Sequence, residues 1–230
     1  MNAPGKAIKV TNIQNIVEGQ IHKKQQYLMN RTALGIPMRE QLSKWIKENR
    51  DSDVIFILDF EGILEASSSV ADEIGPIFFR EFLDHREKVS NRLGELFLVY
   101  GNLSAELAES LERTFSGWSR AYPSETLMVA VGYKMIHDGE FQGYYFLGRP
   151  QLPSKLAEIL DLIYINGDMT SYELEQKGVV APSRKLNEVN ERCPWLVRKT
   201  RVRLEETEKG WTYVYSPILP PQNPVSGEVR

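Results

Sequence analysis

The stretch Val54–Asp59, with the sequence VIFILD, decides the fold of the first part of the chain. Its first five residues are apolar on both sides of an extended backbone, which is typical of a strand buried inside a covered sheet. A second run of this kind, Glu95–Tyr100 (ELFLVY), follows after a segment with helical spacing. Buried strands that alternate with helices predict an α/β fold, with a mixed sheet covered by helices.

Further helices and strands are expected around these two runs. Pro37 opens a helix, because proline is tolerated in the first turn, and Gly75-Pro76 should interrupt the helix that continues to about Arg86. The remaining expected elements are an edge strand over 7–16, a helix capped by Ser104, a strand over 126–135, and a hairpin turn at Asp138-Gly139 that leads into 141–146.

Three consecutive serines, Ser67, Ser68 and Ser69, stand where the first buried strand gives way to a helix. Serine is a favoured N-cap, because its hydroxyl accepts a hydrogen bond from an unpaired backbone N–H. Hydroxyls at the start of a helix are also well placed for a phosphate, since the helix N-terminus favours anions. Helix capping, phosphorylation and ligand binding therefore compete for the same three side chains.

Length and composition indicate a soluble globular protein of two ordinary domains. The chain has 230 residues and a formal net charge of −3, and 42% of its residues are hydrophobic. Its single cysteine, Cys193, excludes a disulfide framework within one chain and suits a reducing cytosol. No apolar run reaches the roughly 18 residues of a membrane span, and the first residues, MNAPGKAIKVTN, lack the apolar core of a signal peptide. We therefore expect a cytoplasmic protein that makes no membrane contact.

Sequence signals for catalysis are absent. The chain contains no G-x-S-x-G elbow, no phosphate-binding loop of the Walker type and no H-E-x-x-H motif. His22, His85 and His137 lie far apart in sequence, without the spacing of metal ligands. We expect no enzymatic activity, no cofactor and no metal site, and we expect Cys193 to be a buried small hydrophobic residue.

A proline-containing stretch divides the chain. Its prolines disfavour the continuation of a strand or a helix, so residues 149–153 are expected to link a first domain, 1–148, to a second, 154–217. The final residues, 218–230, have the composition of a disordered tail.

The second domain has the element order of a small α+β module. Two helices are expected over 154–165 and 170–177, and a third begins at Pro182 with an inward stripe formed by Leu186, Val189 and Cys193. Two strands follow, around 196–205 and 211–215. Three helices before a two-stranded hairpin resemble a winged helix-turn-helix module. The resemblance covers about residues 154–217, and it implies that the third helix is the recognition helix and the hairpin is the wing.

The third helix and the wing are locally basic. Residues 184–203 contain seven basic residues and only two acidic ones, Glu188 and Glu191, an excess of +5 (seven minus two). A local basic element of this kind is typical of DNA binding, and Arg and Asn side chains suit guanine and adenine edges. A solvated helix face, or a winged helix that binds protein, is the alternative. The expected DNA-binding residues are Ser183, Arg184, Lys185, Asn187, Arg198, Lys199, Arg201 and Arg203.

The first domain resembles a STAS domain, the fold of the anti-sigma-factor antagonists, and more closely the bacterial STAS-like proteins. The residues that carry this resemblance, within about 7–135, are Val54–Gly62, Ser67–Ser69, Ala71–Glu73 and Leu96–Leu103. In that family the loop after the corresponding strand usually reads Asp-Ser-Ser-Gly, and a partner kinase phosphorylates one of the serines. The resemblance places that position on Ser68, while Ser67 and Val70 stand in place of the aspartate and the glycine.

Together these features predict a non-enzymatic bacterial regulator of transcription. Its STAS-like domain would sense a partner or a signal, and its winged helix would bind double-stranded DNA. A homodimer through the STAS-like domain would place two winged helices on paired half-sites. The alternative is a partner-switching adaptor, in which the first domain docks a kinase of the histidine-kinase-like ATPase fold and the winged helix binds a protein.

Overall fold

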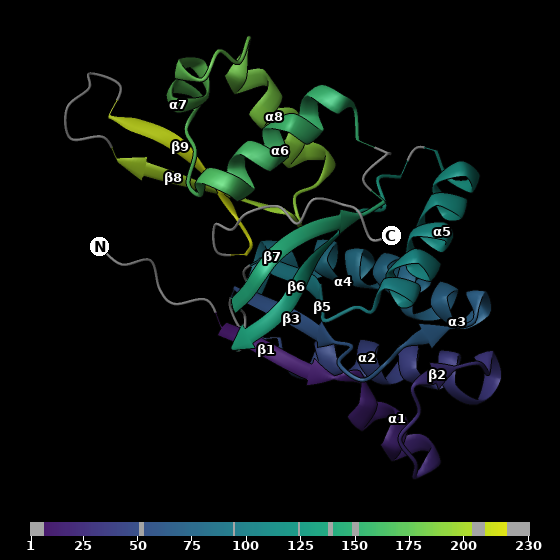
Figure 1. Ribbon diagram of the computed structural model, residues 1–230. Coiled ribbons are helices and arrows are strands. Elements are labelled where there is room, and N and C mark those ends of the chain that lie inside the picture. The colour runs from purple at the N-terminus through teal and green to yellow at the C-terminus, as the bar shows by residue number, and fades with distance from the viewer. Residues whose placement is uncertain are drawn as a thin grey trace.

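The chain is a mixed α/β structure built around one five-stranded sheet (Figure 1). The computed structural model describes residues 7–50, 53–93, 95–123, 125–137, 140–148, 152–203 and 210–219. The strand order is β1-β3-β5-β6-β7, in which the first four strands are parallel and β7 is antiparallel to β6. The strands are β1 (Ala7–Asn12), β3 (Val54–Asp59), β5 (Leu96–Gly101), β6 (Val129–His137) and β7 (Glu140–Leu147).

The two apolar runs that the sequence singles out form the centre of this sheet. Every residue of β3 and of β5 is buried, and each of these strands pairs with a neighbour on both sides. A strand covered on both faces needs apolar residues at successive positions, not only at alternate ones. The predicted α/β fold class is therefore confirmed.

The helices of the first part lie together on one face of the sheet (Figure 1). Because the parallel strands follow one another in order, right-handed crossovers place their connecting helices on the same side. The edge of the Trp45 ring from α2 meets the Phe56 ring of β3 with 5.1 Å between their centroids. The helical segments are α1 (Ile13–Ile21), η1 (Arg31–Gly35), α2 (Ile36–Glu48), α3 (Ser68–Asp72), η2 (Glu73–Ile77), α4 (Phe78–Leu93) and α5 (Ala105–Ala121).

Several boundaries in this part differ from the sequence prediction. The strand expected over 126–135 is β6, from Val129 to His137, and two other boundaries differ by more. The edge strand ends at Asn12 instead of residue 16, because the Asn12 side chain accepts a hydrogen bond from the Gln14 N–H and starts α1. The helix expected to end near Arg86 continues to Leu93, and its buried stripe runs on through Val89. The predicted interruption at Gly75-Pro76 is confirmed, since Gly75 leaves the helical region with φ −98° and ψ −110°.

The β6–β7 hairpin forms one edge of the sheet. The Phe141 ring of β7 lies against two residues without side chains, Gly101 of β5 and Gly132 of β6. A Cβ atom on Gly132 would lie 2.3 Å from this ring, so the close approach requires glycine. The turn predicted at residues 138 and 139 lies outside the described residues. A small parallel sheet, β2 (Tyr27–Leu28) with β4 (Glu65–Ala66), lies beside the serine segment.

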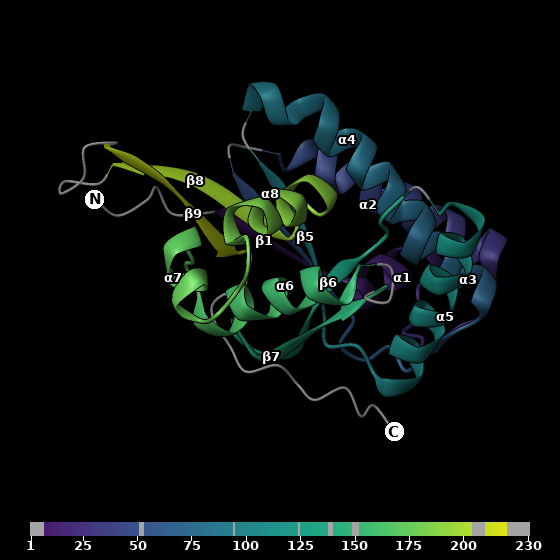
Figure 2. The ribbon, with the colours of Figure 1, turned by 90° about the horizontal axis from the view of Figure 1, so that it is seen from above.

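The C-terminal unit, residues 152–219, has the predicted order of elements. It consists of α6 (Ser154–Asn166), α7 (Ser171–Gln176), α8 (Pro182–Arg192), β8 (Val197–Arg203) and β9 (Trp211–Pro217). The expected inward residues of α8, which are Leu186, Val189 and Cys193, are fully buried. The antiparallel pair β8 and β9, called here the β8–β9 ribbon, extends away from the body of the molecule in Figure 1 and in Figure 2.

The end of this unit differs from the predicted tail over 218–230. Ile218 and Leu219 are each 2% exposed, because they continue from β9 into the core. Residues 204–209, between the two strands of this unit, and residues 220–230 lie outside the described residues.

A buried junction joins the C-terminal unit to the sheet. The Trp195 indole donates a hydrogen bond to the Met128 carbonyl at 2.7 Å, and its ring meets the Phe79 ring edge-on. Arg86 donates to the carbonyls of Leu96 and Pro194, each at 2.9 Å. On the side of β7, three aromatic rings pack together, namely Tyr144, Phe146 and Tyr164. Both units therefore contribute to one continuous apolar core.

None of the helices in the described part of the chain is long and apolar enough to cross a membrane.

Candidate nucleic-acid interface

Helix α8 presents the predicted polar residues at its start. Pro182 occupies the first turn, where its missing N–H costs nothing. Because Leu186 and Val189 face the core, the other side of the helix faces solvent. Ser183, Arg184 and Asn187 are exposed there, and Lys185 is half-buried.

Asn187 ties this helix to the β8–β9 ribbon. Its Oδ1 accepts hydrogen bonds from Lys199 Nζ at 2.9 Å and from the Tyr215 hydroxyl at 2.8 Å. One amide oxygen of α8 is thus held by a side chain from each strand of the ribbon. The start of α8 and one face of the ribbon therefore form a single continuous surface.

That face of the ribbon alternates aromatic rings with cations. Side chains on one face of a strand recur every two residues, so Lys199, Arg201 and Arg203 share it with the three aromatic residues of β9 that pair with them. Lys199 Nζ lies 4.3 Å from the centre of the Tyr213 ring and 5.6 Å from that of Tyr215. Arg201 Cζ lies 4.6 Å from the centre of the Trp211 ring. We call this series the ring ladder; its members are Lys199, Arg201, Trp211, Tyr213 and Tyr215.

Three members of the ring ladder, Trp211, Tyr213 and Tyr215, were not among the predicted site residues. Trp211 and Tyr213 are 49% and 48% exposed, although large aromatic side chains are usually buried. The signal was present as the period-two spacing of residues 211, 213 and 215 opposite the basic positions of β8. Sequence alone did not fix the pairing that places them on one face.

Arg198 lies apart from the other predicted residues. As an even-numbered residue of β8 it points to the opposite face of the ribbon, where it forms an ion pair with Asp53 of the first part of the chain. Its side chain is 18% exposed. This arginine holds the ribbon to the sheet, whereas Lys199 and Arg201 face solvent with Asn187.

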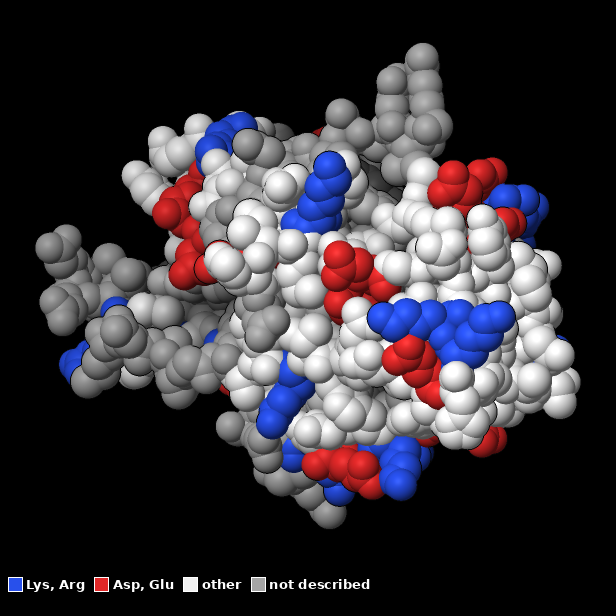
Figure 3. All heavy atoms as spheres, turned by 60° about the horizontal axis from the view of Figure 1, so that its bottom comes forward, with Lys and Arg blue, Asp and Glu red and all other residues white. Residues whose placement is uncertain are grey.

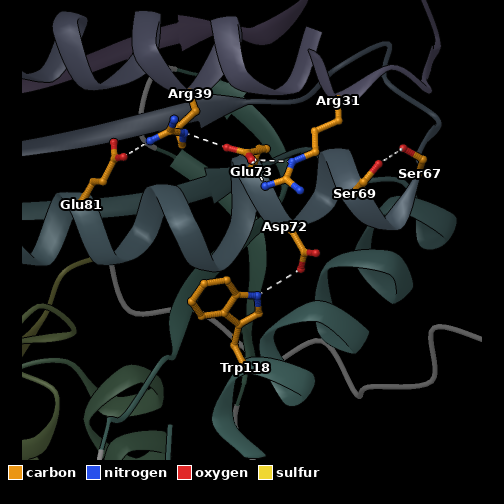
Figure 4. A network of polar contacts seen from close by, with 8 residues as sticks. All are labelled: Arg31, Arg39, Ser67, Ser69, Asp72, Glu73, Glu81 and Trp118. Atoms are coloured by element: carbon orange, nitrogen blue, oxygen red, sulfur yellow. Dashed lines mark hydrogen bonds and ion pairs between the residues drawn. The ribbon is translucent and has the colours of Figure 1, made fainter. Parts of the chain in front are cut away.

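The serine segment begins α3, as its position after a strand predicts. Ser68 is exposed at the first helical position. Ser67 occupies the N-cap position, but its side chain makes no capping hydrogen bond, and its Oγ lies 3.3 Å from Ser69 Oγ (Figure 4). The predicted side-chain capping is therefore wrong for Ser67, whose backbone carbonyl instead accepts the first hydrogen bonds of the helix.

A buried carboxylate lies next to this segment. Glu73 is 2% exposed, and it pairs with Arg31 at 2.6 Å and with Arg39 at 2.7 Å (Figure 4). Arg39 also pairs with Glu81, and the neighbouring Asp72 accepts a hydrogen bond from Trp118 Nε1 at 3.2 Å. A buried charge needs such partners to remain ionised. These charges are paired with one another within the protein, which indicates a structural role.

Asp59 lies at the carboxyl end of β3, the edge at which open α/β sheets bind ligands. Its carboxylate accepts hydrogen bonds from Asn12 Nδ2 at 2.9 Å, Asn102 Nδ2 at 2.8 Å and the Glu61 N–H at 3.0 Å. These donors come from the ends of three adjacent strands. The side chain thus fixes the loops at this edge of the sheet.

Cys193 is fully buried at the end of α8, as predicted. Burial raises the pKa of its thiol to about 12, so the reactive thiolate is suppressed at neutral pH. Within the described ranges, no three His, Cys, Asp or Glu side chains come together in a way that would hold a metal ion.

On the first part of the chain, unlike on the ring ladder, basic side chains lie among acidic ones. Figure 3 looks onto the lower side of Figure 1, where Lys and Arg side chains lie next to Asp and Glu side chains. Among the cations of the first part, Lys44 lies within ion-pair distance of Glu48, and Arg31 lies within ion-pair distance of Glu73. On the ring ladder the neighbours of the cations are aromatic rings instead.

Comparison with known proteins gives no match: no family model, no curated protein and no solved structure resembles this chain closely enough to be identified with it.

Proposed function

We propose that this protein is a DNA-binding regulator whose C-terminal unit is a winged helix. In this proposal α8 is the recognition helix, and the β8–β9 ribbon is the wing. The observation that carries the proposal is the bond of Asn187 to both strands of the ribbon, which joins the exposed start of α8 to the cations of β8. Such a surface offers side chains for base edges beside side chains for phosphates.

The residues divide into two roles. Ser183, Arg184 and Lys185 enter the major groove at the start of α8, where an α-helix fits. Asn187 lies beside them and offers a base its Nδ2 group, since its Oδ1 is held by the ribbon. Lys199, Arg201 and Arg203 contact the phosphate backbone. Arg198 is left out of this contact because its guanidinium pairs with Asp53. The first part of the chain, a STAS-like domain in this proposal, receives a signal and passes it to the DNA-binding unit through the buried junction.

A binding experiment tests this proposal. Fluorescence anisotropy with duplex DNA from the region upstream of the protein's own gene measures the affinity at several salt concentrations. We expect the double variant Arg184→Ala, Lys185→Ala to bind about tenfold to a hundredfold more weakly, since two charged contacts to DNA are removed. The matched control, Lys44→Ala with Arg113→Ala, removes two exposed cations from α2 and α5. Equal affinity of both double variants, without salt dependence, contradicts DNA binding by α8.

A second candidate function is that of a partner-switching adaptor, favoured by the exposure of Ser68 at the start of α3. A phosphate there would add nearly two negative charges to a surface on which a partner docks. If an adjacent reading frame encodes a histidine-kinase-like ATPase, incubation with that ATPase and ATP should add one phosphate, detected by mass spectrometry. The Ser68→Ala variant is the control. Absence of modification in the unaltered protein removes the basis of this second candidate.

A further inference from the structure

The ring ladder offers two large aromatic surfaces that the fold does not need to bury. Trp211 and Tyr213 are about half exposed, whereas Tyr215, further along the same strand, is 4% exposed and belongs to the core. A cation lies over each exposed ring, Lys199 over Tyr213 and Arg201 over Trp211. Each ring therefore has a positive charge beside it.

An intact DNA duplex does not make use of these rings. Bases in a duplex are stacked on one another, so only their edges reach the grooves. The major groove is about 12 Å wide and would be filled by α8. In the minor groove, about 6 Å wide, a ribbon meets base edges and the sugar-phosphate backbone, and it reaches base faces only where the duplex is unstacked. With α8 in the major groove, Trp211 and Tyr213 would contact no base face.

Unpaired bases suit the same surface well. Every base has an aromatic face, and single-stranded nucleic acids bind to proteins through rows of aromatic side chains beside a basic groove. Trp211 and Tyr213 are two residues apart on β9, a spacing of about 6.8 Å along a strand. The cations of β8 recur at the same interval and would neutralise the backbone phosphates that accompany successive bases.

We infer that the ring ladder binds unpaired bases of DNA by stacking on Trp211 and Tyr213, with Lys199 and Arg201 contacting the phosphates. The protein would then prefer DNA that is locally opened beside the duplex segment held by α8. This inference deepens the proposed function, since it rests on DNA being the partner of the C-terminal unit. It assigns base stacking to the ring ladder and groove recognition to α8, so each can be removed separately.

The test compares three labelled probes of one sequence: a duplex, the same duplex with a central mismatched bubble, and one of its strands alone. We expect the full chain to bind the bubble about tenfold more tightly than the duplex, and Trp211→Ala to abolish that preference. Trp211→Phe should keep most of it, because phenylalanine also stacks. Tyr172→Ala is the matched control, since Tyr172 is an exposed aromatic residue of α7 outside the ring ladder.

The outcomes separate this inference from the proposed function. If Trp211→Ala binds the bubble and the strand as tightly as the unaltered protein does, stacking on the ring ladder is overturned, whatever happens to the duplex. If single-strand binding depends on Trp211 while Arg184→Ala with Lys185→Ala leaves duplex binding unchanged, groove recognition by α8 fails and the inference stands. Circular dichroism of each variant confirms that it is folded.

Discussion

The two tryptophans of the C-terminal unit occupy opposite environments. Trp195, in the junction, is 7% exposed, and its indole N–H donates to a backbone carbonyl across the boundary with the sheet. Trp211, on the β8–β9 ribbon, is 49% exposed and is covered on one side by Arg201. The difference shows that the two ends of this small unit have different roles. One end is anchored in the core, and the other keeps an aromatic side chain accessible to solvent.

The arginines of the two regions repeat this contrast. Arg86 in the junction is buried, and burial lowers the pKa of its guanidinium, an effect that Glu95 opposes. Its charge is satisfied by two backbone carbonyls. Arg201 on the ribbon is exposed and lies over a ring. A ring carries no formal negative charge, so a cation stacked on it can still attract an anionic partner.

The largest expected effect is on stability at the junction. Replacing Trp195 by alanine should lower the free energy of unfolding by about 4 kcal/mol, because a buried ring and its hydrogen bond are lost. Trp211→Ala should lower it by less than about 1 kcal/mol, because that ring is half exposed. Urea denaturation followed by circular dichroism measures both. Equal losses of unfolding free energy in the two variants would contradict the difference in burial between Trp195 and Trp211.

The next expected effect concerns the hydrogen bonds of Arg86. Arg86→Ala leaves the carbonyls of Leu96 and Pro194 without this donor, and we expect a loss of about 2 kcal/mol. Arg113→Ala is the control, since its ion pair with Glu109 is on an exposed face of α5 and contributes at most about 0.5 kcal/mol. A loss as small as that of the control would mean that the junction does not depend on this arginine.

A smaller effect is expected from alkaline pH. Burial raises the pKa of the Cys193 thiol from its ordinary value of 9.0 to about 12, so the folded protein favours the protonated form. Its contribution to stability is complete below pH 9 and is lost as the pH rises from 9 to 12. The difference in unfolding free energy between the unaltered protein and Cys193→Ala should therefore shrink by about 1 kcal/mol by pH 10. A constant difference over this range would contradict burial of the thiol.

The smallest expected effect separates the two faces of β8. Arg201→Ala should reduce the slope of log affinity for DNA against log salt concentration by about one, because one phosphate contact is lost. Arg198→Ala should leave the slope unchanged, since its partner is Asp53. Anisotropy titrations at four or so salt concentrations measure both slopes. If both variants reduced the slope equally, Arg198 would belong to the DNA-binding surface.

Much of the fold follows from local sequence patterns. The continuous apolar runs predict β3 and β5, and proline and serine mark the starts of α2, α5 and α8 where they are observed. The helix expected to begin at residue 170 is confirmed, and Thr170 and Glu173 form a capping box there with both reciprocal hydrogen bonds. These features depend on neighbours within a few residues, which the sequence displays directly.

Features that need distant partners were not predicted. The start of α1, residues 13–16, was expected to continue the edge strand, because its branched residues fit a strand as well as a helix. The structure makes it helical and buries Ile13, Ile16 and Val17 against the rest of the fold. Burial of Ile218 and Leu219 likewise depends on the core that the rest of the chain supplies. Local composition carries no information on such packing.

The candidate site divides in the same way. The sequence by itself determined the order of elements and the local basic excess between residues 184 and 203, because both depend on which residues follow one another. Tertiary structure decided the rest, since a strand register settles which side chains share a face. The register of β8 with β9 directs Arg198 to Asp53 and places Lys199 and Arg201 over the rings of β9, beside Asn187 of α8.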